Sequence, residues 1–277
     1  MAELVALVTG GTSGIGLETA RALQNKGCRV YTMSRRPAPA DDEKAEAPAG
    51  VKTFPLRHLQ ADVTDEAAVA AAVAELLTEA GRIDILVNCA GFGISGAVEF
   101  TETADAKRQF DVNFFGMVTV NKAVLPVMRE AGGGRIVNIS SVAAPVPIPF
   151  QTYYSASKAA INSYTMATAN EVRPFGITMC AVQPGDIATG FTAARAKSIA
   201  GDDVYGGRIE KSVAVMEHDE QNGMQASVAG AYIAKVALKK RVKPLYAIGF
   251  QYKAVCVLIK LLPARLANWI IGKLYAA

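Results

Sequence analysis

Apolar residues along the chain fall into two spacings, and each spacing predicts one kind of element. Short apolar runs bounded by glycine, proline or polar residues are typical of buried strands. Such runs occur at residues 4–9, 29–34, 53–60, 83–88, 135–140, 178–183 and 245–248. Elsewhere apolar residues recur every three to four positions, which is the period of an amphipathic helix. These stretches predict helices over residues 14–26, 66–81, 106–130, 154–174 and 226–240.

The alternation of strands with helices predicts the fold class. Strands joined by helical crossovers lie parallel, and the helices cover both faces of the sheet. We therefore expect one α/β domain over residues 1–277, a doubly wound parallel sheet of the Rossmann type with about seven strands.

Two segments interrupt this alternation. Residues 37–50 are rich in proline, alanine and acidic side chains, which predicts a surface loop. Residues 186–224 are polar, contain glycine and show no clear strand. A segment of that length inside a compact domain is usually a binding loop, so we interpret it as a substrate lid. Residues 243–277 form a further C-terminal segment, for contact with substrate or with another subunit.

Composition and charge narrow the function classes. The chain is 51% apolar and 19% charged, and its net charge of +4 is too small to indicate nucleic-acid binding. The two histidines, His58 and His218, have no cysteine or acidic cluster near them, so no metal site is expected. No secretory signal pattern and no apolar run of about 20 residues is visible. Four cysteines without C-x-x-C spacing fit reduced thiols, and we expect a cytoplasmic protein with no transmembrane segment.

A glycine-rich turn follows the first predicted strand and precedes a helix. It reads T-G-G-T-S-G-I-G over residues 9–16, which is a T-G-x-x-x-G-x-G spacing. Glycines allow the backbone to approach a pyrophosphate, whose charge then meets free N–H groups at the helix N-terminus. The alternative is a tight turn that binds nothing, but its place between strand and helix favours a phosphate site. That site comprises Gly10, Thr12, Ser13, Gly14, Ile15 and Gly16.

The end of the second predicted strand indicates which nicotinamide cofactor binds. An acidic residue there would hold the ribose 2′-hydroxyl of NAD, but the chain has Ser34, Arg35 and Arg36. A guanidinium fork suits a 2′-phosphate and stacks on adenine. The alternative is a pair of arginines that face water. We interpret the pattern as a site for NADP(H).

Further motifs follow in order, and together they resemble the short-chain dehydrogenase/reductase family. The resemblance covers roughly residues 4–190, and the C-terminal segment is similar to the 17-beta-hydroxysteroid-dehydrogenase-like branch. Besides the glycine turn, the motifs are Asp62-Val63, Asn88-Cys89-Ala90-Gly91, Asn113, Ser141, Tyr154-x-x-x-Lys158 and Pro184-Gly185. Cys89 stands where the family commonly has asparagine, and the turn should accommodate this compact residue. Each motif falls where a strand ends or a helix begins, which is where open parallel sheets bind ligands.

The spacing of Tyr154 and Lys158 places both side chains on one face of a helix. An ammonium group near a phenol lowers its pKa from about 10, so Tyr154 is expected to act as general acid in reduction and general base in oxidation. Tyr153 is the rival proton donor, but the residue four positions after it is Ser157.

Two further residues complete the expected catalytic group. Ser141 follows a predicted strand, and its hydroxyl would hold the substrate oxygen where charge develops. Ser140 is the alternative, although its side chain should point to the other face. The resemblance implies that Asn113 supports a water molecule that relays protons through Lys158; a structural asparagine that bends its helix is a compatible interpretation.

The resemblance also implies the remaining cofactor contacts. The backbone of Ile187 and the hydroxyl of Thr189 would hold the nicotinamide carboxamide, after the turn made by Pro184 and Gly185. Lys158, beside Tyr154, would reach the ribose of the nicotinamide. Asp62 and Val63 would flank the adenine, and the nearby ribose would be bordered by Asn88, Ala90 and Gly91.

The substrate and partners are less closely specified. Phe92, Ile94 and residues 145–150 are mostly apolar and carry no charge, which favours a small hydrophobic ketone or alcohol of the steroid, retinoid or lipid class. Residues 254–277 combine apolar and basic side chains. We favour packing over the substrate site or against another subunit, with an interfacial helix pair at a membrane surface as the alternative. The resemblance implies a homodimer or homotetramer formed through the helices that carry Asn113 and Tyr154.

Two alternative functions remain at this point. A 3-oxoacyl-thioester reductase would favour basic residues near the pocket mouth, whereas residues 143–150 are apolar. A non-catalytic NADPH-sensing regulator typically lacks the tyrosine or the lysine, and this chain has both Tyr154 and Lys158.

Overall fold

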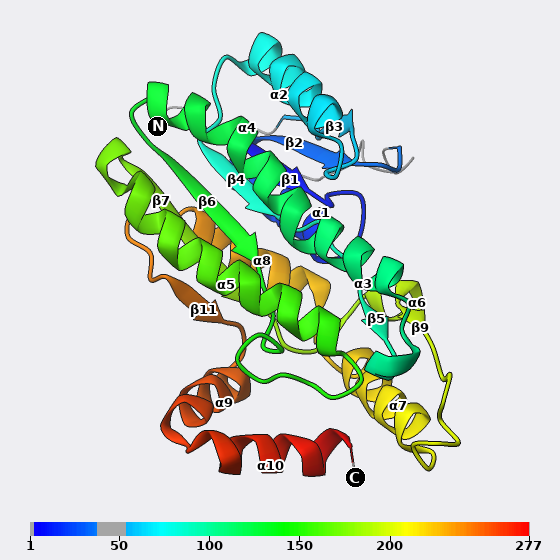
Figure 1. Cartoon of the computed structure of the whole chain (residues 1–277). Coiled ribbons are helices and arrows are strands. Elements are labelled where there is room, and N and C mark those ends of the chain that lie inside the picture. Colours follow the sequence, from blue (N-terminus) through cyan, green and yellow to red (C-terminus); the bar gives the residue numbers. More distant parts are fainter. Residues whose placement is uncertain (1–2, 38–53, 277) are drawn as a thin grey trace.

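The central element of the protein is a parallel sheet whose strand order is β11-β7-β6-β4-β1-β2-β3 (Figure 1). The computed structural model describes residues 3–37 and 54–276, so nearly all of the predicted loop at 37–50 lies outside the described residues. All seven predicted strands are present in this sheet, although several are shorter than expected. They are β1 (Val5–Thr9), β2 (Arg29–Ser34), β3 (Arg57–Gln60), β4 (Ile85–Asn88), β6 (Gly134–Ile139), β7 (Ile177–Gln183) and β11 (Leu245–Ala247).

Two hydrophobic cores lie on the two faces of this sheet, because alternate side chains of a strand point to opposite faces. In β1, Val5 and Leu7 belong to one core, whereas Ala6 and Val8 belong to the other. The first core is covered by α2 (Glu66–Ala80), α4 (Gly116–Glu130) and α5 (Thr152–Val172). The second is covered by α1 (Gly14–Gln24) and α8 (Ala226–Ala237). The doubly wound Rossmann-type fold is therefore confirmed.

One long predicted helix is divided in the structure. The continuous apolar period predicts a single helix over residues 106–130, but α3 (Thr103–Phe110) and α4 are separated by a π-helical turn over Asp111–Phe115. A π turn widens the helix by one residue, and such turns often occur at functional sites. Asn113 lies inside this turn.

The segment interpreted as a lid has more regular structure than its sequence predicts. Within residues 186–224 the structure shows α6 (Phe191–Ala194), α7 (Arg208–Gln221) and the short strands β8 (Ile187–Ala188) and β9 (Ala196–Lys197). β8 pairs with β10 (Met224–Gln225), and β9 pairs with β5 (Ile94–Ser95). The sequence did not indicate α7, because this helix is polar on most of its surface and gives only a weak apolar period.

Two helices follow the last strand of the sheet. They are α9 (Phe250–Leu261) and α10 (Ala264–Tyr275), which lie beyond β11 as an appendage to the sheet (Figure 1). The short turns Val98–Phe100 and Arg173–Phe175 complete the regular structure. Among residues 3–37 and 54–276, every helix is too short or too polar to span a bilayer.

Candidate active site

The glycine turn after β1 and the segment after β4 meet where the strand order reverses. β1 lies between β4 and β2. The strands β2 and β3 follow on one side of β1, and β4 with the later strands lies on its other side, so the strand order reverses between β1 and β4. The Thr9 hydroxyl accepts hydrogen bonds from the backbone N–H groups of Cys89 (3.1 Å) and Ala90 (3.2 Å). A side-chain carbon at Gly10 would lie 2.9 Å from the Ala90 nitrogen, so only glycine fits this approach. The structure thus brings two predicted cofactor segments together.

The first turn of α1 has the features of an anion site. α1 begins after Ser13 without a side-chain cap, which leaves N–H groups of its first turn free for a ligand. A side-chain carbon at Gly16 would lie 2.2 Å from the Gly10 carbonyl oxygen, so the turn folds tightly against itself. Gly14 has a positive φ of 54° and faces the Thr189 side chain. The residues present fit a pyrophosphate.

Polar side chains at the end of β2 surround this glycine turn. The Arg36 guanidinium donates to the Ser13 hydroxyl at 2.6 Å, and the hydroxyls of Thr12 and Ser34 lie 3.1 Å apart. Arg35 is mostly exposed, and its Nε lies 3.7 Å from the Asp62 carboxylate. The Arg36 guanidinium therefore lies beside the phosphate cradle, and the Arg35 guanidinium lies beside Asp62.

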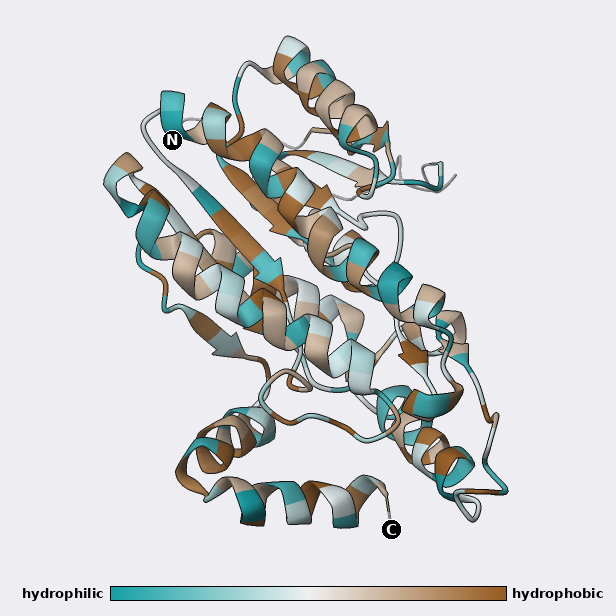
Figure 2. Cartoon of the chain, in the orientation of Figure 1, coloured by the Kyte–Doolittle hydropathy of each residue, from teal (hydrophilic) through white to brown (hydrophobic). Residues whose placement is uncertain are grey.

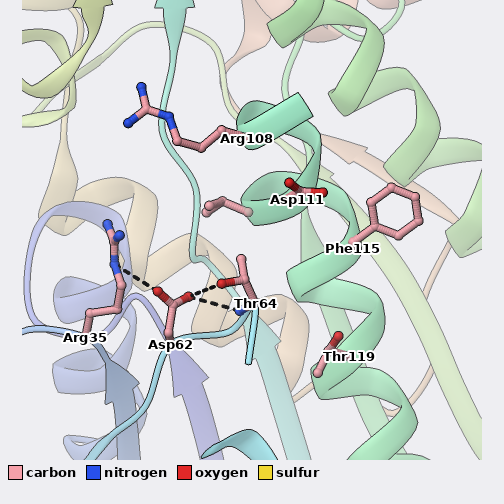
Figure 3. A pocket seen from close by; sticks show the side chains of 8 residues that line it. Arg35, Asp62, Thr64, Arg108, Asp111, Phe115 and Thr119 are labelled. Carbon is pink, nitrogen blue, oxygen red and sulfur yellow. Dashed lines mark hydrogen bonds and ion pairs between the residues drawn. The ribbon is translucent and has the colours of Figure 1, made fainter. Parts of the chain in front are cut away.

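A shallow pocket of about 390 Å³ opens beside Asp62. Figure 3 shows Arg35 and Asp62 on the strand side, with Arg108, Asp111 and Phe115 on the helical side. The Asp62 carboxylate accepts hydrogen bonds from the Thr64 backbone (3.0 Å) and hydroxyl (2.8 Å), which fix its orientation. This pocket lies at the adenine end of the predicted cofactor path, away from Tyr154.

Asn88 and Val63, which were predicted to border the ribose and the adenine, point their side chains into the protein interior. The Asn88 amide donates to Asn121 and Asn138, both at 2.9 Å, in a buried network. Val63 is buried in the first core and packs against Gly116. A cofactor would therefore meet the backbone at these positions. Ala90, whose N–H group donates to the Thr9 hydroxyl, and the following Gly91 lie in the same segment after β4.

Tyr154, Ser141 and Lys158 form one cluster at the carboxyl end of β6. Tyr154 is hydrogen-bonded to Ser141, and the Lys158 ammonium donates to the Ile139 carbonyl oxygen at 2.9 Å. Lys158 Nζ lies 5.6 Å from the centre of the Tyr154 ring. The Ser140 hydroxyl instead donates to the Lys158 carbonyl oxygen at 2.9 Å, so it points into α5.

The expectation that Lys158 lowers the pKa of Tyr154 was wrong for the protein alone. Burial raises the pKa of Tyr154 to about 12, although the hydrogen bond to Ser141 acts in the opposite direction. Burial also lowers the pKa of Lys158 to about 8, so part of its charge is lost near neutral pH.

Asn113 joins the π-helical turn to the segment after β4. Its amide oxygen accepts from the Phe92 N–H at 3.0 Å, and its amide nitrogen donates to the Phe92 carbonyl oxygen at 3.0 Å and to Ser157 at 3.3 Å. A side-chain carbon at Gly91 would lie 3.1 Å from the Asn113 oxygen and 3.7 Å from Lys158 Nζ. Asn113 and Lys158 therefore border Gly91 together.

The segment after β7 passes close to the same cluster. The Pro184 carbonyl oxygen accepts from the Val142 N–H at 2.9 Å, which ties this segment to the one that holds Ser141. Ile187 is buried within β8, and the Thr189 hydroxyl accepts from the Phe191 N–H at 3.1 Å. A side-chain carbon at Gly185 would lie 2.3 Å from the Tyr252 ring, so α9 packs directly on this turn.

The turn before α5 carries backbone strain. Phe150 has a φ of 58°, and within residues 3–37 and 54–276 no other residue except glycine has a positive φ. Such a conformation costs energy and persists only where its surroundings hold it. The Phe150 side chain packs with Ala97 and Ile209, and its carbonyl oxygen accepts from the Gly96 N–H at 2.9 Å. These contacts fix the start of the helix that carries Tyr154.

A buried charge pair near Tyr154 was not predicted from the sequence. Arg195 forms a salt bridge with Glu220, and the Arg195 side chain is 1% exposed. Its guanidinium lies 5.8 Å from the centre of the Phe191 ring, which itself lies 5.8 Å from the Tyr154 ring. Glu220 also accepts from the Thr192 hydroxyl at 2.6 Å. The expectation of surroundings without fixed charge was therefore wrong.

This pair also acts on the Tyr154 hydroxyl through its charges. Glu220 and Asp186 raise the pKa of Tyr154, whereas Arg195 lowers it. No sequence pattern joins Arg195 to Glu220, because they lie on α6–β9 and α7, in a segment without clear periodicity. Tyr252 was missed for a similar reason: its hydroxyl donates to the Asp186 carboxylate at 2.5 Å from a distant helix.

Comparison with known proteins agrees with this fold. A family model described as short chain dehydrogenase matches residues 4–200. The chain therefore belongs to the short-chain dehydrogenase/reductase family, and it is an oxidoreductase of a family that uses nicotinamide cofactors.

Individual relatives are similar over most of their length. A 3-ketodihydrosphingosine reductase of Bacteroides thetaiotaomicron is 40% identical over 242 residues, which cover 87% of this chain and 86% of the relative. The crystal structure of a short-chain dehydrogenase from Streptomyces avermitilis has a TM-score of 0.82 at 30% identity, with 97% and 96% of the two chains covered. The structure of ElxO with NADP bound has a TM-score of 0.72 at 26% identity, with 91% and 100% covered.

Proposed function

We propose that the protein is an NADPH-dependent reductase that converts a long-chain keto lipid, of the 3-ketodihydrosphingosine type, into the corresponding alcohol. The observation that carries this proposal is the cluster of Tyr154, Ser141 and Lys158 beside the phosphate cradle. The substrate class draws on the relative named 3-ketodihydrosphingosine reductase. It narrows the hydrophobic class expected from the sequence to lipids rather than steroids or retinoids.

The proposed reaction assigns one task to each residue. NADPH, when bound, supplies the hydride that adds to the carbonyl carbon. Ser141 holds the carbonyl oxygen, and Tyr154 donates its phenolic proton to that oxygen as the alcohol forms. In the protein alone the phenol is protonated at neutral pH, so it holds the proton that this acid role requires. Lys158 would hold the ribose hydroxyls and, with Asn113, return a proton to Tyr154.

Carboxylates near Tyr154 support a substrate with an amino group beside its ketone. Asp186 and Glu220 both act on the pKa of Tyr154 through their negative charge. A sphingoid ketone carries an ammonium group on the carbon next to its carbonyl. The negative charge of these carboxylates, which are paired with Arg195 and Tyr252, would favour such a cation near Tyr154.

The preference for NADPH rests on Arg35 and Arg36. The end of β2 offers no carboxylate to a ribose 2′-hydroxyl. The Arg36 guanidinium lies beside the glycine turn, and the Arg35 guanidinium lies beside Asp62. The NADP-bound ElxO supports NADP binding in a similar fold. The remaining residues of the cofactor path are those predicted, from Gly10 to Gly16, from Asn88 to Gly91 and from Pro184 to Thr189.

Exposed apolar side chains near α4 and α5 support a proposed oligomer, and the unpaired cysteines support a proposed cytoplasmic location. Phe115 and Met166 expose apolar side chains next to α4 and on α5, which fits a homodimer or homotetramer formed through these helices. The four cysteines are unpaired, which fits the reducing cytoplasm.

The proton donor is tested by changing each of two adjacent tyrosines. Tyr154→Phe should lower the turnover number by about 10²-fold or more, because the reaction then lacks its general acid. NADPH affinity, measured by fluorescence titration, should stay nearly unchanged. Tyr153→Phe is the matched control and should keep most of the activity. Retained turnover in Tyr154→Phe, or a comparable loss in Tyr153→Phe, would contradict the assignment.

The substrate class is tested with three ketones and NADPH, by following loss of NADPH absorbance. We expect kcat/KM to be highest for 3-ketodihydrosphingosine, lower for a long-chain ketone without the amine, and lowest for a steroid ketone. A steroid ketone reduced as well as the sphingoid ketone would overturn the substrate class and leave the proton donor untouched.

The cofactor assignment is tested with single variants of the two arginines. Arg35→Asp and Arg36→Ser should each weaken NADPH binding by about tenfold or more, since each removes a charge-assisted contact with the 2′-phosphate. NADH binding should change far less. Arg173→Gln, at the far end of α5, is the control for removing an exposed positive charge. Equal weakening of both cofactors would refute the assignment.

A further inference from the structure

The C-terminal helix pair, α9 and α10, exposes an unusual amount of apolar surface. No residue of α9 is buried, and Phe250, Leu261 and Leu258 are 88%, 76% and 54% exposed. On α10, Trp269 is 61% and Leu274 is 65% exposed. Large side chains of this kind gain free energy when they leave water, so a contiguous set of them marks an interaction surface.

The exposed side chains of α9 share one face of that helix. Phe250, Ala254, Val257, Leu258 and Leu261 follow the spacing of an apolar helical stripe. The opposite face carries the half-buried residues, which are Tyr252, Cys256 and Ile259. Figure 2 shows apolar residues along both helices of the pair, alternating with polar ones on α10. α9 therefore has one face on the protein and a second apolar face without a partner in the described chain.

The charges in this part of the chain all have one sign. Residues 239–277 contain eight basic residues and no acidic residue, while the whole chain has a net charge of only +4. They are Lys239, Lys240, Arg241, Lys243, Lys253, Lys260, Arg265 and Lys273. Arg265, Trp269 and Lys273 follow one another at intervals of four residues, so they lie in one row along α10. The rest of the chain is net acidic.

We propose that the C-terminal helix pair docks the protein on an anionic lipid surface. Helices with Trp, Phe and Leu beside Lys and Arg suit the boundary between headgroups and acyl chains. The basic residues are attracted to anionic headgroups, and the apolar face enters the acyl region. Symmetric pairing with a second copy would bring together two helix pairs that each carry four basic residues and no acidic residue, which charge repulsion opposes. The charge therefore selects lipid over a second copy as the occupant.

The helix pair is held to the body at both ends, which leaves its outer surface free. The Tyr252 hydroxyl donates to Asp186 at 2.5 Å and accepts from the Asp186 N–H at 3.1 Å. At the other end, Arg208 Nε donates to the Ala276 carbonyl oxygen at 2.7 Å. Ala267 and Ile271 are the buried residues of α10. The lipid-facing surface would thus be rigidly placed relative to the segment after β7.

The single tryptophan of the chain is a built-in probe of docking. Trp269 is the sole tryptophan and lies at the proposed surface. Addition of phosphatidylcholine vesicles that contain phosphatidylglycerol to the full chain should shift its emission to shorter wavelength, and the protein should sediment with the vesicles. Vesicles of phosphatidylcholine alone should bind on the order of tenfold more weakly, and added salt should weaken binding to the anionic vesicles.

Variants separate the apolar face from the charges. Phe250→Ser with Leu258→Ser should lower the vesicle partition coefficient by about tenfold or more. Lys253→Gln with Lys260→Gln should abolish most of the preference for phosphatidylglycerol. Val204→Ser removes an equally exposed apolar side chain elsewhere, with 70% exposure, and should bind vesicles like the unchanged protein. Circular dichroism should confirm that each variant keeps the fold.

Several results would overturn the docking proposal. They are unchanged Trp269 emission with anionic vesicles, equal binding to both vesicle types, and equal partition of the Phe250/Leu258 variant. A concentration-dependent shift of Trp269 emission without lipid, abolished together with an oligomer by the same variant, would assign the surface to a second copy. Because these measurements need no substrate, they are independent of the proposed reductase activity.

Discussion

The chemistry of the Tyr154 hydroxyl depends on a few charged neighbours. Burial dominates and keeps the phenol protonated, and Ser141 is its direct hydrogen-bond partner. Glu220 and Arg195 oppose one another, because a carboxylate disfavours the phenolate and a guanidinium favours it. The two charges are joined in a salt bridge, so their effects partly cancel. Arg195 is thus a positioning residue that acts through the Phe191 ring and through its charge.

Single neutral variants of this pair should move the pH profile in opposite directions. In the proposed mechanism, oxidation of the alcohol needs the Tyr154 phenolate, so the rate in that direction should rise with pH through the pKa of Tyr154. Glu220→Gln removes a charge that raises this pKa and should shift the rising limb to lower pH. Arg195→Gln removes a charge that lowers the pKa and should shift the limb to higher pH. The measurement is the pH dependence of kcat for alcohol oxidation.

The stability of the same variants provides the control. Either single change leaves a buried charge without its partner, which typically costs about 3 kcal/mol of unfolding free energy. Both variants should therefore lose stability alike, while their pH profiles diverge. The double variant Arg195→Gln with Glu220→Gln should return the profile toward that of the unchanged protein. Shifts in the same direction for both single variants would show that the pair has a structural role only.

At the scale of elements, α9 is attached to the segment after β7 through one side chain, Tyr252. The Tyr252 ring lies on Gly185, where any larger residue would collide with it. Its hydroxyl both donates to and accepts from Asp186. Burial and the neighbouring acids raise the pKa of Asp186. One phenol therefore connects a C-terminal helix to a segment of the predicted nicotinamide site.

Removal of the Tyr252 hydroxyl should loosen α9 while the sheet stays intact. Tyr252→Phe keeps the ring on Gly185 but deprives Asp186 of two hydrogen-bond contacts, which should cost about 1–3 kcal/mol. Hydrogen exchange of the α9 amides should become faster, and exchange in β1, β4 and β6 should stay slow. Tyr232 lies on α8, and its ring contacts the Lys253 ammonium of α9. Tyr232→Phe is the matched control and should leave the α9 amides protected from exchange. Equal exchange of α9 in both variants would contradict this account.

At the scale of the whole molecule, the sheet was predictable because most of its strands, β3 excepted, are nearly continuous apolar runs. The starts of two strands differ from the prediction. β3 begins at Arg57 rather than residue 53, and β4 begins at Ile85 rather than residue 83. The π-helical turn at Asn113 could not be predicted, because one extra residue in a turn hardly disturbs the apolar period. The helix α7 was missed because its polar surface hides its period.

The candidate site likewise contains some residues that could be predicted from the sequence and others that could not. Residues at strand ends, such as Ser141, and residues with a fixed spacing, such as Tyr154 and Lys158, could be placed from sequence because the parallel sheet gathers them at one edge. The pair Arg195–Glu220 and the contact Tyr252–Asp186 depend on how segments outside the sheet fold back. The pKa of Tyr154 depends on burial, which the spacing of two residues does not specify.

The phenol of Tyr252 also sets a thermodynamic relation between two distant ligands. If a ligand at the Asp186 segment favours one position of α9, it changes the affinity of the outer surface of that helix for any second ligand that distinguishes between the positions. Reciprocity then requires that each ligand change the affinity of the other by the same factor. A dinucleotide that strengthens vesicle binding fivefold, for instance, would itself be held about five times more tightly by vesicle-bound protein.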